Sequence, residues 1–337
     1  MVTRDVAPRR TNLLGLGAGE AWETLVLDVA RPGRAVLRVE AAGSRLMVVR
    51  QGGEVVLLAA VDDDRGGVEY ARTGRFRSPV PPVRRAHAAA LAAGGTGSDW
   101  QARWAHYFAT TLTAAPAGPL QAGRWAICGG DTRPWTYGPE LGPAQRWQRI
   151  LLASDSGWIE WVCANEGREV GEVLPLRDMA EPGDGRVRSY RKQVRDGILP
   201  PVLLWWISGL DCHVILDGHD RLAAAIAEDA EPPLLELHSL SERYAAENTE
   251  IVVDHYAAAA GVSRPAVARA AASRVFASEL RYIQTEHAST RAWPLRGGTA
   301  AWTDLTRANA PDLLIAADLA GSSPPAGIDP PRQNGRF

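Results

Sequence analysis

Residues 214–229 read VILDGHDRLAAAIAED and set the pattern from which the rest of the chain can be interpreted. The apolar run at 214–216 is typical of a short buried strand. The alanine-rich run from Leu222 onward has the composition of a helix. Between the two runs lie Asp-Gly-His-Asp-Arg, at 217–221. The stretch therefore predicts a strand that passes directly into a helix through a polar turn.

Such a junction suits an anion. The first N–H groups of a helix have no acceptor within the helix, and the helix dipole favours negative charge there. Gly218 lets the backbone approach a phosphate closely, and Arg221 can add a charge-assisted contact. His219 can donate to a phosphate or orient a reacting group. The expected binding residues are Gly218, His219, Asp220, Arg221 and Leu222.

The two aspartates of this turn suggest different roles. Asp217, at the strand end, could hold Mg²⁺ or accept a proton from a hydroxyl group. Asp220, as an early helical residue, could simply complement the helix dipole. The plainer alternative is an ordinary strand-to-helix turn in which Asp217 caps the helix.

The flanking sequence predicts a compact α/β unit over residues 170–240. The expected order is strand, helix, strand, strand, helix, strand. The stretch GILPPVLLWWISGLDCHVILDGHDRLAAAIAEDAEPPLLEL resembles the ParB/sulfiredoxin-like fold. The resemblance rests on Gly197, Leu199, Pro201, Val202, Gly218, Arg221 and Ala224. It covers 170–240, or 170–290 with the helices that follow, and does not reach residues 1–165.

The turn indicates which branch of that family is closest. ParB proteins use Gly-Glu-Arg-Arg to bind CTP, sulfiredoxins use Gly-Gly-Cys-His-Arg, and free serine kinases use Asp-Gly-His-His-Arg. This chain has Asp-Gly-His-Asp-Arg, with no cysteine in the turn and Cys212 on the incoming strand. The resemblance therefore implies a phosphotransferase that uses ATP or ADP with Mg²⁺ on a small hydroxyl-bearing substrate. Asp220 departs from the kinase pattern, because a carboxylate beside a phosphate is repulsive unless a cation intervenes.

The kinase-like members also carry a glutamate after the first strand, acting on the substrate hydroxyl. Glu181 is the nearest match, with Asp178 and Asp184 as substitutes, so the catalytic candidates are Glu181, Asp217 and His219, and Asp217 is the metal candidate. A solvated loop carboxylate is the alternative for Glu181. The basic helix at 186–192 faces either the phosphates or solvent.

A competing interpretation comes from residues 251–275, which resemble a helix-turn-helix. Ser263, Arg264 and Arg269 would lie on its recognition helix and contact DNA. ParB-group proteins carry such a module directly after the nucleotide domain, so this reading implies a CTP-controlled, DNA-binding switch and leaves a homodimer open. The net charge of −2 argues against a whole-protein affinity for nucleic acid. A helical cap on the α/β unit, and a catalytically inactive binding module, are further alternatives.

The expected class is α+β, with a β-rich N-terminal domain at 1–165, the α/β domain at 170–240 and a helical segment at 241–310. The N-terminal part predicts an antiparallel meander at about 20–75, a helix at 99–112, a loop-like stretch at 123–147 and then two strands around a turn at 155–157. The helical segment predicts helices at 241–258, 264–288 and 298–308. The tail at 318–337 is rich in Pro, Gly and Ser and predicts disorder.

The bulk composition favours a cytoplasmic protein. The three cysteines are far apart and show no metal-ligand spacing, which is typical of reduced thiols. The N-terminal apolar run is too short for a signal peptide, and no later run is long enough to cross a membrane. We therefore expect no membrane partner.

Overall fold

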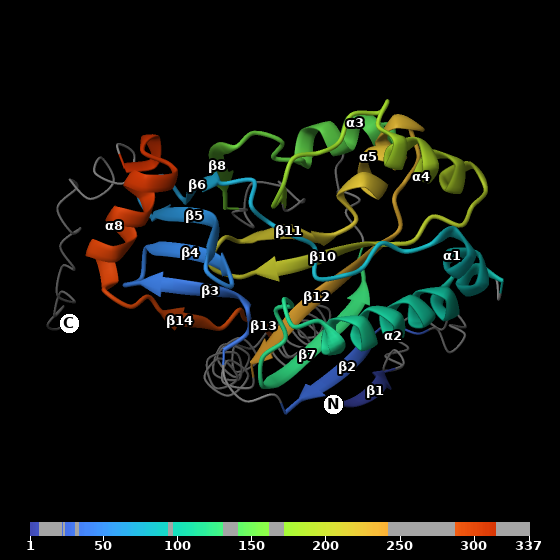
Figure 1. Ribbon diagram of the computed structural model, residues 1–337, viewed down its shortest axis with the longest axis horizontal. Helices are drawn as coiled ribbons and strands as arrows, with labels where there is room; N and C mark the ends of the chain where they lie inside the picture. The colour runs from blue at the N-terminus through green and yellow to red at the C-terminus, as the bar shows by residue number, and fades with distance from the viewer. Residues whose placement is uncertain are drawn as a thin grey trace, which may run out of the picture.

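The computed structural model describes residues 1–6, 22, 24–30, 34–93, 97–130, 141–161, 172–241 and 287–314. Two β-sheets and the helices packed on them make up this part of the chain (Figure 1). The presence of both multi-stranded sheets and helices agrees with the expected α+β class. No helix within the described ranges is both long and apolar enough to cross a membrane.

The larger sheet, sheet A, has eight strands in the order β1-β2-β7-β12-β10-β11-β9, with β13 paired to the end of β12. The strands are β1 (Val2–Val6), β2 (Thr24–Val29), β7 (Gly123–Gly129), β9 (Val173–Pro175), β10 (Val202–Ile207), β11 (Cys212–Asp217), β12 (Leu234–Ser241) and β13 (His287–Ala288). Its central strands are almost wholly buried, as the continuous apolar runs in their sequences predict.

The order expected for residues 170–240 is confirmed. β9 is followed by α4 (Gly185–Arg195), β10, β11, α5 (His219–Ala227) and β12. β11 is antiparallel to β10 and parallel to β9, whereas β10 and β12 are parallel. The C-terminal end of β11 therefore lies at the same end of the strands as the starts of β10 and β12, and α5 begins there.

The expected separation of a domain at 1–165 from the α/β unit is not what the strand pairing gives. β7 pairs with β12 from Leu235↔Gly129 to Leu240↔Arg124, and β2 pairs with the other side of β7. Sheet A therefore contains strands from both sides of residues 165–170. The reason is that β12 has backbone N–H and C=O groups along both of its edges. β10 pairs with one edge, and β7 pairs with the other.

The smaller sheet, sheet B, has six strands in the order β14-β3-β4-β5-β6-β8. The strands are β3 (Leu37–Ala42), β4 (Leu46–Gln51), β5 (Glu54–Asp62), β6 (Gly67–Arg72), β8 (Ser156–Glu160) and β14 (Ala292–Pro294). The meander from β3 to β6 is antiparallel throughout, as expected. β2, which the sequence grouped with this meander, belongs to sheet A.

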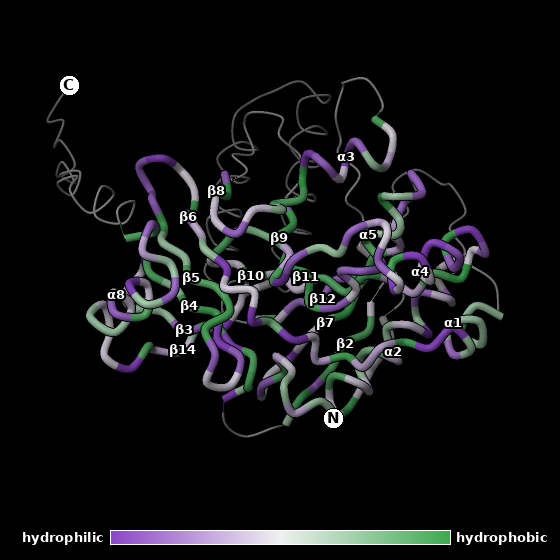
Figure 2. The backbone as a smooth tube through the Cα atoms, turned by 45° about the horizontal axis from the view of Figure 1, so that its top comes forward, coloured by the Kyte–Doolittle hydropathy of each residue, from purple (hydrophilic) through white to green (hydrophobic). Residues whose placement is uncertain are grey.

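The helices cover the sheets on defined faces. α2 (Ser98–Ala114), beside α1 (Arg85–Ala92), packs on one face of sheet A through Trp104 and Phe108, and this core continues to sheet B. α3 (Pro143–Ile150) and α5 pack on the opposite face, where Trp147 meets Leu222. α8 (Gly298–Asn309) covers the outer face of sheet B through Trp302. Figure 2 shows hydrophobic residues along the inner strands of both sheets, interspersed with hydrophilic ones.

Several elements differ from the sequence expectation. The region at 123–147, expected to be loop-like, contains β7 and most of α3, and its Trp125 and Trp147 are fully buried core residues. The strand expected after the turn at 155–157 is β8, which begins at Ser156. In the C-terminal segment, β12 extends to Ser241, and β13 and β14 are strands. α8 confirms the helix expected at 298–308. The rest of 241–286, with the helix-turn-helix candidates Ser263, Arg264 and Arg269, and the tail at 318–337 lie outside the described residues.

Candidate functional site

The turn between β11 and α5 has the backbone geometry expected of it. Gly218 precedes the first helical residue and has a φ of +101°, in the left-handed region that favours glycine. A Cβ built on Gly218 would lie 2.8 Å from Nη2 of Arg221. Among the described residues, no side chain caps the start of α5. The plainer alternative, in which Asp217 caps the helix, is therefore wrong, and the first N–H groups of α5 keep no side-chain acceptor among the described residues.

A β-bulge sets the direction of Asp217. Leu203 pairs with Asp217, whereas the next residue, Leu204, pairs with Ile215. One extra residue therefore sits on β11 just before its end. Bulges of this kind turn a side chain toward a different direction and are common next to functional sites.

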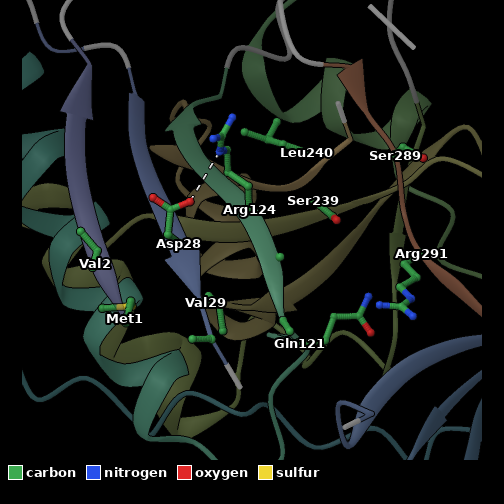
Figure 3. Close-up of a pocket in the computed structure, with 13 residues that line it drawn as sticks. Met1, Val2, Asp28, Val29, Gln121, Arg124, Ser239, Leu240, Ser289 and Arg291 are labelled. Atoms are coloured by element: carbon green, nitrogen blue, oxygen red, sulfur yellow. Dashed lines mark hydrogen bonds and ion pairs between the residues drawn. The ribbon is translucent and has the colours of Figure 1, made fainter. Parts of the chain in front are cut away.

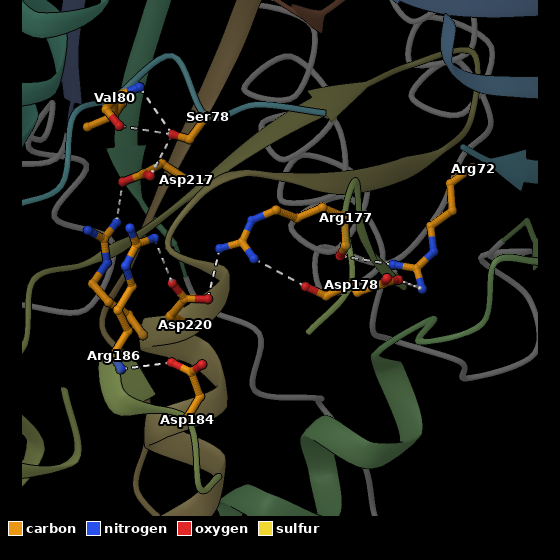
Figure 4. Close-up of polar contacts among 10 residues, drawn as sticks. Arg72, Ser78, Val80, Arg177, Asp178, Asp184, Arg186, Asp217 and Asp220 are labelled. Atoms are coloured by element: carbon orange, nitrogen blue, oxygen red, sulfur yellow. Dashed lines mark hydrogen bonds and ion pairs between the residues drawn. The ribbon is translucent and has the colours of Figure 1, made fainter. Parts of the chain in front are cut away.

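Asp217 and Arg221 form a buried ion pair. Nη2 of Arg221 donates to Oδ2 of Asp217 at 2.6 Å, and the hydroxyl of Ser78 donates to Oδ1 at 2.6 Å (Figure 4). The Arg221 side chain is only 3% exposed. Both oxygens of Asp217 are thus engaged by protein donors, which leaves little capacity for direct Mg²⁺ coordination. Arg221, expected to contact a phosphate, is held against the strand end by this pair.

Asp220 is neutralised by two arginines. Its Oδ1 accepts from Nη2 of Arg177 at 2.8 Å, and Nη1 of Arg186 lies 3.7 Å from Oδ2. Arg177 follows β9 and Arg186 lies in the first turn of α4, so three segments meet at this carboxylate (Figure 4). The negative charge that distinguishes this turn from the kinase pattern is therefore compensated.

His219 is buried without a hydrogen-bond partner. It is 1% exposed, and neither ring nitrogen has a partner within the described part of the chain. Burial, followed by the nearby cations Arg177, Arg72 and Arg221, lowers the pKa of His219 well below its usual value. The imidazole is therefore neutral at neutral pH, so it can give and take hydrogen bonds but cannot neutralise a phosphate.

The expected base, Glu181, is not brought to the turn. It is exposed in the segment between β9 and α4, and no contact in the described ranges joins it to residues 217–221. Of its substitutes, Asp178 pairs with Arg72 and Asp184 accepts from the backbone N–H of Arg186 as the cap of α4. Leu222 is fully buried in the core between α5 and α3, so its side chain has a packing role.

Three of the basic residues of α4 contact acidic residues of the neighbouring helix segment. Arg191 Nε and Arg195 Nη1 lie 2.5 Å and 2.9 Å from Oε1 of Glu228, at the end of α5. These contacts lower the pKa of Glu228, the hydrogen bond from Arg191 most of all. With Arg186 at Asp220, α4 is tied to both ends of α5.

Sequence patterns did not predict three residues that contact the turn or lie close to it: Ser78, Arg72 and Arg177. Ser78 lies far from the turn in the chain, in the proline-rich stretch RSPVPPV, and no local pattern connects it to Asp217. Arg177 follows a strand recognised from its sequence, so its position at the same sheet edge could have been expected from the parallel pairing of β9 with β11. Arg72 lies on sheet B.

A separate pocket of about 820 Å³ opens at the opposite end of sheet A (Figure 3). Its polar side chains are those of Asp28, Gln121, Arg124, Ser239, Ser289 and Arg291. Nε of Arg124 lies 3.5 Å from Oδ1 of Asp28. None of its lining residues belongs to the turn. Because β11 runs opposite to β12, the pocket and the turn lie at opposite ends of the strands.

Comparisons of the chain with protein-family models, with curated proteins and with solved structures found no match.

Proposed function

We propose that the turn at 217–221 binds the phosphates of a nucleotide, and that the protein transfers a phosphoryl group to a small hydroxyl-bearing substrate. The observation that carries the proposal is His219, an imidazole buried at an uncapped helix start with no partner for either nitrogen. Buried polar groups without partners are rare and destabilising, so one at a helix start needs an explanation. A bound phosphate would supply an acceptor for both the imidazole and the backbone N–H groups.

The charges around the turn support an anion. Arg72, Arg177 and Arg221 lie close enough to His219 to lower its pKa. Asp217 takes only one of the five donors of Arg221, and the buried Nε of that arginine has no partner among the described residues. Arg221 can therefore stay paired with Asp217 and still donate to a phosphate oxygen. Since Asp220 is paired, it does not oppose this binding.

The expected division of roles changes in two respects. His219 acts as a neutral hydrogen-bond donor. Arg221 supplies the positive charge that stabilises the phosphoryl group during its transfer. Mg²⁺ would neutralise phosphate charge, and it would be held mainly by the nucleotide because Asp217 already has two donors. Glu181 remains the candidate base, reaching a substrate hydroxyl from the exposed segment before α4.

A second candidate is a module that binds nucleotide without transferring phosphate. The closed pair between Asp217 and Arg221 favours it, since the strand-end carboxylate is not free to act as a base. The CTP-controlled DNA switch, with Ser263, Arg264 and Arg269, stays a prediction, as does the homodimer.

Calorimetric titration with ATP, ADP and CTP, each with Mg²⁺, tests the binding step. Wild type and the exposed-site control His87→Phe should bind, while His219→Phe and Arg221→Lys should bind about tenfold more weakly or worse, because each loses at least one charged or buried hydrogen bond. Absence of nucleotide binding to wild type would contradict the proposal. Preference for CTP would favour the DNA switch.

Transfer is tested separately with nucleotide labelled in its terminal phosphate and small hydroxyl compounds, beginning with free serine. Glu181→Gln should keep nucleotide binding and lose transfer, whereas Glu54→Gln, a change at an exposed glutamate on sheet B, should keep both. Binding without transfer in wild type would favour the binding module.

A further inference from the structure

Side chains that bind transition metals converge on sheet A, away from the turn. Cys128 lies on β7, and Glu236 and His238 lie on β12. The thiol sulfur, a carboxylate oxygen and a ring nitrogen of these residues all lie within 4.8 Å of one another. The strand register pairs Cys128 directly with Glu236, and strand alternation puts His238 on the same face. The cluster is therefore fixed by two neighbouring strands.

A further residue, His213 on β11, lies against the carboxylate of this group. Its Nε2 lies 3.4 Å from Oε2 of Glu236, and Nε2 of His238 lies 3.1 Å from the same oxygen. Bonds of about 2.0–2.3 Å to a tetrahedral zinc ion place its ligand atoms about 3.3–3.8 Å apart. Glu236 and His238 are already close to that separation, and all three ligand atoms lie within 4.8 Å of one another, so side-chain movements of about 1 Å would bring them around one ion.

The side chains of the cluster are mostly buried but remain partly accessible to solvent. The side chains of His213, Glu236 and His238 are 15–17% exposed, which leaves a path for a cation. Nδ1 of His238 is buried and has no partner within the described ranges. Nearby, Sγ of Cys128 lies 3.8 Å from the backbone oxygen of Glu236. The contacts among these groups thus leave donor and acceptor capacity unused.

We propose that Cys128, Glu236 and His238 bind one Zn²⁺ ion or a similar divalent transition metal, with His213 holding the Glu236 carboxylate in position. A thiolate, an imidazole and a carboxylate together select zinc-like ions over Mg²⁺ or Ca²⁺, which take oxygen ligands. The site is therefore distinct from any Mg²⁺ that accompanies a nucleotide at the turn. A bound ion would tie β7 to β12 and so join the two halves of sheet A.

Titration of the full chain with Co²⁺ alone, followed by displacement with Zn²⁺, tests the site. One equivalent of Co²⁺ should produce thiolate-to-cobalt absorption in the near ultraviolet and ligand-field bands in the visible range, and Zn²⁺ should abolish both. Cys128→Ser and His238→Gln should lose stoichiometric binding. The matched controls Cys212→Ser, at the other described cysteine, and His87→Gln should retain it. His213→Gln should weaken affinity about 10–100-fold while the spectrum keeps its form.

A variant with both Cys163→Ser and Cys212→Ser keeps Cys128 as its single thiol, since the chain has three cysteines. Thiolate absorption in that variant supports the site even if Cys128→Ser fails to fold. Failure of the wild-type chain to bind one equivalent of either ion would overturn the proposal. Retention of the thiolate band in folded Cys128→Ser would overturn it as well.

Discussion

His219 is the residue at which local stability and the proposed function conflict. In the unfolded chain its ring nitrogens bind water, whereas in the folded protein neither has a partner among the described residues. Leaving a buried polar group unpaired costs about 1–3 kcal/mol. Substituting an apolar ring of similar shape beside Phe76, whose centroid lies 5.9 Å away, removes that cost.

We therefore predict that His219→Phe stabilises the protein by about 1 kcal/mol at pH 7, measured by urea unfolding. Its effect should also depend on pH. Because the folded-state pKa of His219 lies well below its usual value of 6.5, only the unfolded chain takes up this proton as the pH falls through 6.5. The free energy of unfolding of the wild type therefore falls as the pH drops below 6.5, and His219→Phe does not share that loss.

The advantage of His219→Phe should therefore grow between pH 7 and pH 5. His87→Phe, at an exposed histidine, is the control variant for the same pH series. A lower stability of His219→Phe at pH 7 would indicate that the imidazole has a partner in solution.

At the scale of the element, α5 begins where it does because Gly218 can adopt a positive φ. The hairpin turn between β3 and β4 contains a second such glycine, Gly43, with a φ of +71°. The two differ in their surroundings. A Cβ at Gly43 would meet nothing within 4 Å, whereas one at Gly218 would meet the guanidinium of Arg221.

Gly43→Ala should therefore cost only the backbone strain, about 1–2 kcal/mol. Gly218→Ala should cost about 2 kcal/mol more, because Arg221 is held by Asp217 and cannot move away freely. Chemical denaturation of the two variants measures the difference. Equal losses would mean that the ion pair yields easily.

Sequence patterns predicted elements better than they predicted contacts. β9 to β12, α4 and α5 were recognisable because their apolar runs and glycine boundaries lie within each segment. β7 was missed because GRWAICGG lies among glycines and prolines, and β14 because it is three residues long and ends in Pro294. At the site, the glycine turn and the grouping at 217–221 were predicted. Ser78 and Arg72 were not, since only the folded chain brings them near the turn.

At the scale of the whole molecule, Arg72 joins the two sheets. It lies at the end of β6 in sheet B, with a side chain that is 4% exposed. Its guanidinium donates to the backbone oxygens of Ala153, Pro175 and Arg177, of which Pro175 belongs to β9 in sheet A. Arg72 also forms ion pairs with Asp155 and with Asp178, the second of which is drawn in Figure 4.

Arg72→Met should lower the free energy of unfolding by about 3 kcal/mol or more, because buried carbonyl groups lose their donor. Arg75→Met is the control, since Arg75 is half exposed and pairs with Glu54 at 3.6 Å; its loss should be below about 1 kcal/mol. Urea unfolding followed by tryptophan fluorescence measures both. Similar losses for the two variants would show that the sheets are held together by their apolar core alone.

The pairing of β7 with β12 also bears on how the chain folds while it is being synthesised. When β7 leaves the ribosome it can pair with β2, but its other edge stays open until residues 235–240 have been translated. An open, apolar strand edge invites association with other nascent chains. The N-terminal half should therefore depend on chaperones during translation, and synonymous codons that slow synthesis between β7 and β12 should increase aggregation.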